Sequence, residues 1–347
     1  MRVLITGHTG FKGAWLSMLL SARGHDVTGI ALDPEPNALF DTAHLASRLH
    51  ADIRLDIRRA DELADAIRTA APEVVLHLGA QALVRESYRD PRTTFETNAI
   101  GTLNVLDAMS RTEGIRAAVI VTTDKVYRNV GRLEGYREDD PLGGDDPYSA
   151  SKAMADLLTQ SWVTSFPGVP TAIARAGNVI GGGDVSKDRL LVDLVAGFRE
   201  ARTVPIRYPD AVRPWQHVLD CLSGYLTLAA ALLEGRGAGA WNFGPDPESF
   251  QSVRGIADAA AARWGEGAVW ADAPGDHPHE ATLLTLDPSK AQQGLGWRNR
   301  LTYPDSLEWT IDWYRDVDRH GDAERTTLAQ IDRFTDLDAG SAWQESF

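Results

Sequence analysis

Short apolar runs alternate with segments of helical periodicity through the first half of the chain. The apolar runs, which are almost uninterrupted, span Val3–Ile5, Val27–Ala31, Val74–Leu78, Ala117–Thr122 and Thr171–Ala176. The helical segments between them span Phe11–Arg23, Ala60–Ala70, Thr93–Met109 and Tyr148–Ser165. Strands that are apolar on both faces are typical of parallel sheets covered by helices. The pattern therefore predicts an α/β fold with a doubly wound parallel sheet, whose ligands bind at the carboxyl ends of the strands.

This rhythm changes after about Asn178. A triple-glycine loop at 181–183, which suggests a flexible pocket rim, is followed by expected helices at 188–201, 221–233, 253–264 and 306–313 and short strands at 204–206 and 240–243. We therefore predict a first domain over residues 1–178 and a smaller mixed α/β substrate-binding lobe over residues 179–316, with some segments returning to the first domain. Residues 317–347 carry many charges and weak periodicity, which predicts a C-terminal extension made of a surface helix and a tail.

The composition narrows the possible functions. Of the 347 residues, 43% are apolar, enough for a sizeable core, and the net charge of −14 argues against a nucleic-acid partner. Cys221 is the only cysteine, so neither an intrachain disulfide nor a cysteine-rich zinc site can form. The chain begins with a strand pattern rather than a secretion signal, and no apolar stretch is long enough to span a bilayer. We expect a cytoplasmic enzyme without membrane association.

A glycine-rich turn lies between the first strand and the first helix. Gly7, Gly10 and Gly13 have the spacing Gly-x-x-Gly-x-x-Gly, one residue looser than in the Rossmann folds of separate dinucleotide domains. Gly7 permits the tight turn, Gly10 lets backbone approach a diphosphate, and Gly13 allows close packing of helix on strand. The free N–H groups of the helix N-terminus would then bind the diphosphate of a dinucleotide. The sheet is thus predicted to be a Rossmann sheet.

The cofactor predicted by this arrangement is NAD. Asp33 follows the second strand, where a carboxylate accepts hydrogen bonds from ribose hydroxyls and repels a 2′-phosphate, although it could also be a turn residue before Pro34. Lys12 could support a phosphate or point into solvent. The complete predicted cofactor site comprises Gly7, Thr9, Gly10, Phe11, Lys12, Gly13, Asp33, Asp56, Ile57, Leu78, Ala80, Thr122, Tyr148 and Lys152.

Tyr148 and Lys152 predict hydride chemistry. Their i,i+4 spacing places them on one face of a helix. A phenol with a pKa near 10 is a poor base at neutral pH, but a neighbouring ammonium and a positive nicotinamide ring would lower that pKa. Tyr148 would then take the proton of a sugar hydroxyl while the carbon gives hydride to NAD, and Thr123 would hydrogen-bond the same oxygen. A chance Tyr-x-x-x-Lys on a surface helix is the alternative.

Asp124 and Lys125, at the end of the fifth strand, extend this chemistry. Oxidation at C4 of a hexose makes the C5 proton acidic, and loss of the C6 hydroxyl then requires an acid. Asp124 is the candidate acid, provided that burial raises its pKa. Lys125 is either the C5 base or a fixed cation that stabilises the enolate, and the two residues could also form a structural ion pair. Oxidation followed by elimination is the chemistry of a sugar dehydratase.

Several longer strings carry a resemblance to a known family. They are TGHTGFKGAWL at 6–16, HLGAQALVRESYRDP at 77–91, TTDKVY at 122–127, GYREDDPLGGDDPYSASK at 135–152, ARAGNVIGGGD at 174–184, RPWQHV at 213–218, AWNFGP at 240–245 and HPHEA at 277–281. The chain resembles the extended short-chain dehydrogenase/reductases, and within them it is most similar to the CDP-glucose 4,6-dehydratase branch. The dTDP-glucose branch, in contrast, usually has a glutamate where Lys125 stands.

The resemblance implies conversion of CDP-D-glucose to CDP-4-dehydro-6-deoxy-D-glucose and water, with NAD reduced and reoxidised in each cycle. It implies a homodimer, and the expected substrate contacts are Gln81, Asn178, Arg189 and Arg213. Val185, Val192 and Leu133 depart from the family pattern on the substrate side, which bears on the choice of base and sugar. His277, His279 and Glu280 superficially suggest a metal site, but without a further clustered ligand we predict none.

Two other functions compete with a dehydratase. A nucleotide-sugar epimerase or simple dehydrogenase would use Tyr148, Lys152 and NAD but would need neither Asp124 nor Lys125. An NAD-binding sensor or scaffold without turnover is the third hypothesis, against which the complete set of polar residues argues.

Overall fold

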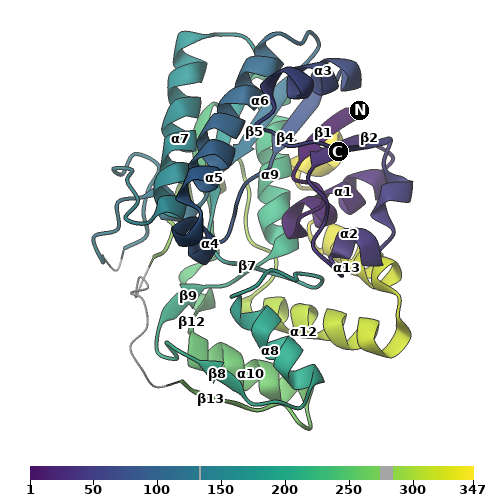
Figure 1. The fold of residues 1–347 in the computed structure, drawn as a ribbon, viewed down its shortest axis with the longest axis vertical. Helices are drawn as coiled ribbons and strands as arrows, with labels where there is room; N and C mark the ends of the chain where they lie inside the picture. Colours follow the sequence, from purple (N-terminus) through teal and green to yellow (C-terminus); the bar gives the residue numbers. More distant parts are fainter. Residues whose placement is uncertain (133, 274–283) are drawn as a thin grey trace.

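The centre of the molecule is a parallel sheet of seven strands (Figure 1). The structure is a computed structural model that describes residues 1–132, 134–273 and 284–347. The strands are β1 Arg2–Thr6, β2 Asp26–Ala31, β3 Ala51–Arg54, β4 Val74–His77, β5 Ala117–Val121, β6 Thr171–Ala176 and β11 Gly239–Phe243. Their order, β3-β2-β1-β4-β5-β6-β11, reverses direction between β1 and β4, where a doubly wound sheet opens a crevice for ligands. The predicted Rossmann sheet is confirmed.

Helices cover both faces of this sheet because successive strand side chains point to opposite sides. Val3 and Ile5 of β1 belong to the larger core, which packs under α1 and α9, whereas Leu4 belongs to a second core under α3, α6 and α7. The helices of this part are α1 Phe11–Ala22, α2 Leu39–Thr42, α3 Ala60–Ala70, α4 Val84–Arg89, α5 Pro91–Phe95, α6 Gly101–Ser110, α7 Pro147–Ser165 and α9 Val218–Leu233. Single helical turns lie at Leu45–Arg48, Asp124–Val126 and Pro247–Ser249.

The helix expected at 93–109 is interrupted. Between α5 and α6 the chain makes one wide π-helical turn at Glu96–Ile100. This turn directs Asn98 inward, where its amide donates to Gln81 O at 3.0 Å and to Ser151 Oγ at 2.9 Å. Wide turns of this kind recur near functional sites, and this one ties the end of β4 to helix α7.

A smaller mixed lobe lies beyond the carboxyl ends of the strands, as Figure 1 shows with α8, α10, β8 and β13 grouped below the sheet. Its elements are β7 Val179–Ile180, α8 Leu190–Arg199, β8 Val204–Ile206, β9 Val212–Pro214, β10 Gln216–His217, β12 Phe250–Ser252, α10 Val253–Trp264, β13 Trp270–Asp272 and α12 Tyr303–His320. Helix α11, Ser289–Gly294, packs instead on β11 of the central sheet. The strands form three pairs, β7 with β10, β9 with β12 and β8 with β13. Helix α9 and strand β11 return to the first sheet, where β11 pairs with β6. The division at residue 178 stays a prediction.

The triple-glycine loop is buried and closely packed, contrary to the flexibility expected of it, and its place at a pocket rim stays a prediction. A Cβ on Gly181 would lie 2.7 Å from Val218, and one on Gly182 would lie 2.0 Å from Trp313. The indole of Trp15 also donates to Gly182 O at 2.9 Å. These glycines are needed because large side chains occupy the space that a Cβ would fill.

The C-terminal segment also differs from the expected surface helix and tail. It forms α13 Ala323–Leu337 and α14 Ala342–Ser346, which contact α1 and α9 respectively. The side chain of Trp343 is fully buried and its indole donates to Asp338. Two aromatic residues, Trp343 and Phe347, bury enough surface to dock a segment whose charge pattern predicts exposure.

None of the helices that the structure describes is both long and apolar enough to cross a membrane. The cytoplasmic location stays a prediction.

Candidate active site

The glycine-rich turn has the geometry that a bound dinucleotide requires. Gly7 has a φ of +77°, and a Cβ there would lie 2.8 Å from the backbone N of Gly79. A Cβ on Gly13 would lie 2.1 Å from Gly7 O, so only glycine lets α1 start this close to β1. Helix α1 begins after Gly10 without a side-chain cap, which leaves its first N–H groups for an anion. These features fit the diphosphate of NAD.

An exposed carboxylate lies just after β2. The Asp33 side chain is 91% exposed and forms a long ion pair with Arg54, whose Nε lies 4.0 Å from the carboxylate. Arg54 is held elsewhere, since it pairs with Asp52 at 2.8 Å and lies over the Phe40 ring. The carboxylate is therefore available for ribose hydroxyls, and its role in binding NAD stays a prediction.

Other predicted cofactor contacts surround this crevice. Asp56 pairs with Arg58 at 2.6 Å, and the hydrogen bonds from Arg58 lower the pKa of the carboxyl. Thr9 Oγ donates to Leu32 O at 3.1 Å, which joins the glycine-rich turn to the end of β2. The remaining positions, Phe11, Ile57, Leu78 and Ala80, lie in the same turn or directly after β3 and β4.

Lys12 turns inward, so the solvent alternative is wrong. Its Nζ donates to the Tyr225 hydroxyl at 3.1 Å, across the boundary between α1 and α9. Burial lowers the pKa of Lys12, and the charge of Arg189 lowers it further. The first helix thus contributes a half-buried amine to the polar site.

Tyr148 and Lys152 share one face of α7, as their spacing predicts. Lys152 is 5% exposed and its Nζ donates to Val121 O at 2.8 Å, which ties α7 to the end of β5. Burial, together with the charge of Lys12, lowers the pKa of Lys152 to about 7. Neighbouring Thr122 Oγ donates away from the cofactor side, to Asp156 at 3.0 Å.

The expectation of a depressed phenol pKa is wrong for the protein alone. Burial raises the pKa of Tyr148 to about 12; hydrogen bonding with Thr123 acts against this rise, and the charge of Asp124 adds to it. The ammonium of Lys152 is directed at the Val121 carbonyl rather than at the phenol, so it gives little help. The positive ring of oxidised NAD would act in the favourable direction.

Thr123 and Asp124 form a hydrogen-bonded pair beside Tyr148. Thr123 Oγ donates to Asp124 Oδ1 at 2.8 Å, and Asp124 is 5% exposed. Burial raises the pKa of Asp124, although the charge of Lys125 opposes this shift. A Cβ on Gly177 would lie 2.9 Å from Asp124 Oδ2, so the glycine keeps that oxygen accessible. A carboxyl that holds a proton in this place can act as an acid.

The residues expected to bind substrate already have contacts within the protein. Arg189 Nη1 lies 3.4 Å from Asp184, and Arg213 Nη1 donates to Val212 O at 3.0 Å. The backbone O of Asn178, two residues after β6, accepts from Gln216 N at 3.2 Å. Their binding of a nucleotide diphosphate stays a prediction.

Gln81 has a structural use that the sequence did not indicate. Its Nε2 donates to Leu83 O at 3.1 Å and to Thr94 Oγ at 2.9 Å, which braces the turn after β4. A substrate would have to compete with these bonds. Leu133, one of the unusual positions, lies outside the described residues.

Behind the site lies a buried network that sequence reasoning missed. Arg175 donates to both oxygens of Asp156 at 2.8 Å, and both side chains are fully buried. Arg175 also donates to Tyr127 OH at 2.7 Å, which in turn donates to Asn242 at 2.7 Å. The signals were present, since an arginine in an apolar strand and an aspartate one turn after Lys152 are unusual when unpaired.

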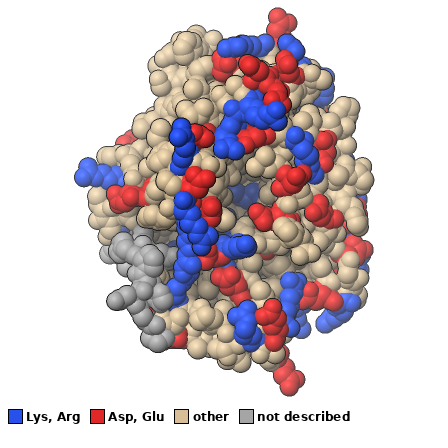
Figure 2. Space-filling view, in the orientation of Figure 1, with Lys and Arg blue, Asp and Glu red and all other residues tan. Residues whose placement is uncertain are grey.

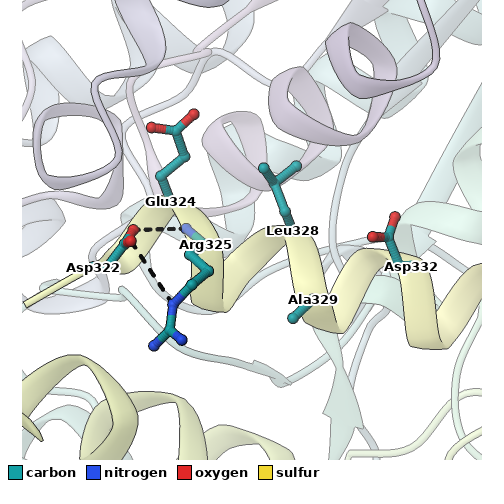
Figure 3. Close-up of a pocket in the computed structure, with 6 residues that line it drawn as sticks. All are labelled: Asp322, Glu324, Arg325, Leu328, Ala329 and Asp332. Carbon is teal, nitrogen blue, oxygen red and sulfur yellow. Dashed lines mark hydrogen bonds and ion pairs between the residues drawn. The ribbon is translucent and has the colours of Figure 1, made fainter. Parts of the chain in front are cut away.

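A second hollow lies on the surface of α13 (Figure 3). Asp322, Glu324, Arg325 and Asp332 line it, and Asp322 already binds the backbone and the guanidinium of Arg325.

Among the residues that the structure describes, no three or more His, Cys, Asp or Glu side chains gather as metal ligands. His277, His279 and Glu280 lie outside that part of the chain. On the face in Figure 2, acidic and basic side chains are interspersed.

The order of the strands, the uncapped helix after a glycine turn and the Tyr-x-x-x-Lys pair define a dinucleotide-binding Rossmann fold. The chain belongs to the NAD dependent epimerase/dehydratase family, whose model matches residues 3–244. The prediction that NAD is the cofactor is thereby confirmed.

Individual similar proteins have activities that are narrower than the family description. The CDP-glucose 4,6-dehydratase of Salmonella typhimurium is 43% identical over 325 residues, which cover 90% of this chain and 90% of that protein. The dTDP-glucose 4,6-dehydratase of Streptomyces griseus is 31% identical, covering 90% and 93%. A dTDP-glucose 4,6-dehydratase from Streptomyces venezuelae, solved with NAD bound, has a TM-score of 0.77 and 27% identity and covers 91% of this chain and 97% of its own. The resemblance drawn from the sequence strings is confirmed.

Proposed function

We propose that this protein is a nucleotide-sugar 4,6-dehydratase that converts CDP-D-glucose to CDP-4-dehydro-6-deoxy-D-glucose and water. The observation that carries the proposal is Asp124, a buried carboxyl with a raised pKa, hydrogen-bonded beside Tyr148 and Thr123. An epimerase or simple dehydrogenase has no step that uses such an acid. The 43% identity to a CDP-glucose 4,6-dehydratase supports the same reaction and the same base.

NAD, held at the glycine-rich turn of Gly7, Gly10 and Gly13, would supply the hydride acceptor for C4 of the sugar and the hydride donor for C6. Tyr148 accepts the proton of the C4 hydroxyl, and Thr123 orients that oxygen. Asp124 then gives its proton to the C6 hydroxyl, which leaves as water. Lys125 is partly exposed next to Asp124 and acts on C5 either as a base or as a fixed positive charge. Arg189 and Arg213 are the candidate diphosphate ligands, since their planar guanidinium groups match phosphate oxygens.

The decisive experiment is product analysis by NMR in heavy water with CDP-, dTDP-, GDP- and UDP-glucose. We expect a 4-keto-6-deoxy product that carries one solvent deuterium at C5, formed fastest from CDP-glucose. An epimerised hexose, or oxidation without loss of water, would refute the dehydratase. Faster turnover of another nucleotide would keep the reaction and change the substrate to a different nucleotide-hexose, which is the alternative that the sequence left open.

The proposed homodimer has a candidate surface on the α7 side of the sheet. Met154 and Leu157 of α7 are 46% and 53% exposed, and Ile100, from the adjoining π-helical turn, is 46% exposed. Apolar side chains gathered on neighbouring helices support association with a second copy through these helices. We expect the double substitution Met154→Glu and Leu157→Glu to give a monomer in light-scattering measurements. A dimer that persists in this variant would place the interface elsewhere.

A further inference from the structure

An arginine lies beside the carboxylate that is expected to bind the ribose of NAD. Arg54 is the last residue of β3, and it pairs in register with Ala31, the last residue of β2. Its Nη1 donates to Leu32 O at 3.2 Å, and its Nε lies 4.0 Å from Asp33 Oδ1. Dinucleotide-binding folds that use NADP hold the 2′-phosphate with a nearby arginine. The chain thus carries a candidate group for each of the two cofactors in one place.

The guanidinium of Arg54 is held from three directions. Besides its bond to Leu32 O, its Nη2 donates to Asp52 Oδ2 at 2.8 Å, and its carbon lies 4.7 Å from the centre of the Phe40 ring. The other oxygen of Asp52 is hydrogen-bonded at 2.8 Å to Nε2 of His8, whose side chain is fully buried. A guanidinium that is already fixed in this way loses little conformational freedom when it binds an anion.

The same guanidinium has donors left for a ligand. It carries five N–H groups. Among the residues that the structure describes, its hydrogen-bonding partners are Leu32 O and Asp52, which use two of these groups. The Arg54 side chain is 32% exposed, so a ligand at the surface can contact it. A phosphate monoester has three acceptor oxygens and a charge of about −1.5 to −2 at neutral pH, and its oxygens match a guanidinium fork.

Asp33 decides which cofactor this arginine can serve. Asp33 and Asp52 place two carboxylates within 4.0 Å of one guanidinium, so the charge at this place is negative before a ligand binds. A 2′-phosphate would be repelled there, whereas the neutral 2′-hydroxyl of NAD can donate to Asp33. Without the Asp33 carboxylate, one guanidinium faces one carboxylate, and the repulsion is removed. The Asp33 side chain is 91% exposed, so replacing it does not disturb the core.

We propose that Arg54 is a ligand for a 2′-phosphate and that the carboxylate of Asp33 masks it. Removing this carboxylate converts the adenosine end of the cofactor site from NAD to NADP. The proposal concerns the choice of cofactor alone, so it holds whether the protein dehydrates or epimerises its substrate.

The test is a double-mutant cycle on the dissociation constants of NADH and NADPH, measured by calorimetry on the full chain freed of bound nucleotide. Asp33→Asn should bind NADPH about 100-fold more tightly than the wild type and NADH about tenfold more weakly. Asp33→Asn combined with Arg54→Met should lose the gain in NADPH affinity and bind NADH as Asp33→Asn does. Asp26→Asn removes the same charge from the exposed first residue of β2, at the opposite end of the strand. This matched control should change neither constant.

Two results would overturn the proposal: no gain in NADPH affinity for Asp33→Asn, or a gain that survives Arg54→Met. An equal loss of NADH and NADPH affinity in the double variant would overturn it as well, because Arg54 would then have a structural role only. If Arg54→Met does not fold, Arg54→Gln, which keeps a donor for Asp52 but carries no charge, takes its place with the same expectations. Since these measurements involve no sugar, their failure leaves the proposed dehydratase intact, and product analysis of CDP-glucose leaves the role of Arg54 intact.

Discussion

Asp124 and Asp156 are both buried near the end of β5, but their hydrogen-bonding partners differ. Those partners favour different protonation states of the two carboxyl groups. Asp156 is clamped by Arg175 through two hydrogen bonds of 2.8 Å and also accepts from Thr122 and Gln160. Within the part of the chain that the structure describes, no guanidinium hydrogen-bonds to Asp124, whose Oδ1 accepts from the neutral hydroxyl of Thr123. A guanidinium fork stabilises the ionised form of a carboxyl, whereas burial without one favours the protonated form.

The comparison shows that two aspartates near the end of one strand can have separate roles, one in stabilising the fold and one in the proposed reaction. The Asp156–Arg175 pair joins α7 to β6 and so fixes the helix that carries Tyr148 and Lys152. Burial raises the pKa of Asp124, although the charges of Lys125 and Arg213 oppose this shift, and a raised pKa is what a proton donor requires. Replacing each aspartate by asparagine should therefore damage different properties.

The largest expected effect is on catalysis by Asp124→Asn. The amide has nearly the same shape but cannot deliver a proton, so we expect loss of water to slow about 1,000-fold. Reduction of NAD and exchange of the C5 proton should persist, because neither step uses this acid. Rapid-mixing absorbance of NADH and NMR of the quenched sugar measure the two stages separately. Normal product formation by this variant would remove Asp124 from the mechanism.

Asp156→Asn should instead affect stability. Removing one partner of a fully buried ion pair leaves the Arg175 guanidinium uncompensated, which costs about 3 kcal/mol of unfolding free energy. Urea unfolding of the variant and the wild type measures the change. The double variant Asp156→Leu with Arg175→Met is the control, since it leaves no unpaired charge and should recover much of the loss. A loss of catalysis with unchanged stability would contradict the distinction between the two aspartates.

The sequence predicted the reacting residues of this site better than the buried residues that hold them in place. Apolar runs and glycine spacing were enough to place the crevice, and Asp124 could be recognised because it follows a buried strand. The partners of Arg175 could not be predicted, since they come from α7 and from the segment between β5 and α7, which only the folded chain brings together. For the same reason the inward turn of Lys12 and the docking of Trp343 were missed, because each depends on a surface supplied by α9 or α1.

Lys152 provides a third prediction, because it lies one helical turn from Asp156 but does not pair with it. The pKa of Lys152 falls from its ordinary value of 10.5 to about 7 in the folded protein. Between these values the unfolded chain binds more protons, so stability should rise with pH, by at most about 1.4 kcal/mol per pH unit. Lys152→Met should be more stable than the wild type near neutral pH and should lose this rise.

Urea unfolding at several pH values between neutrality and pH 10 measures the slope. Lys125→Met is the control, because Lys125 is only partly buried and its removal should leave the slope as it is in the wild type. Equal slopes for Lys152→Met and the wild type would show that the lysine keeps its proton on folding.

An exposed carboxylate completes the series with the smallest expected effect. Asp322 caps the N-terminus of α13, where its side chain accepts from Arg325 N at 2.9 Å (Figure 3). Asp322→Ala leaves that N–H without its cap and should lower the unfolding free energy by about 1 kcal/mol. Asp322→Asn keeps an acceptor oxygen and should cost only a few tenths of that amount. Neither change should alter turnover, because the Asp322 side chain is 49% exposed and its contacts lie within α13. A decrease in activity for Asp322→Asn at unchanged stability would contradict this prediction. It would mean that Asp322 affects the reaction centre by a route other than capping α13.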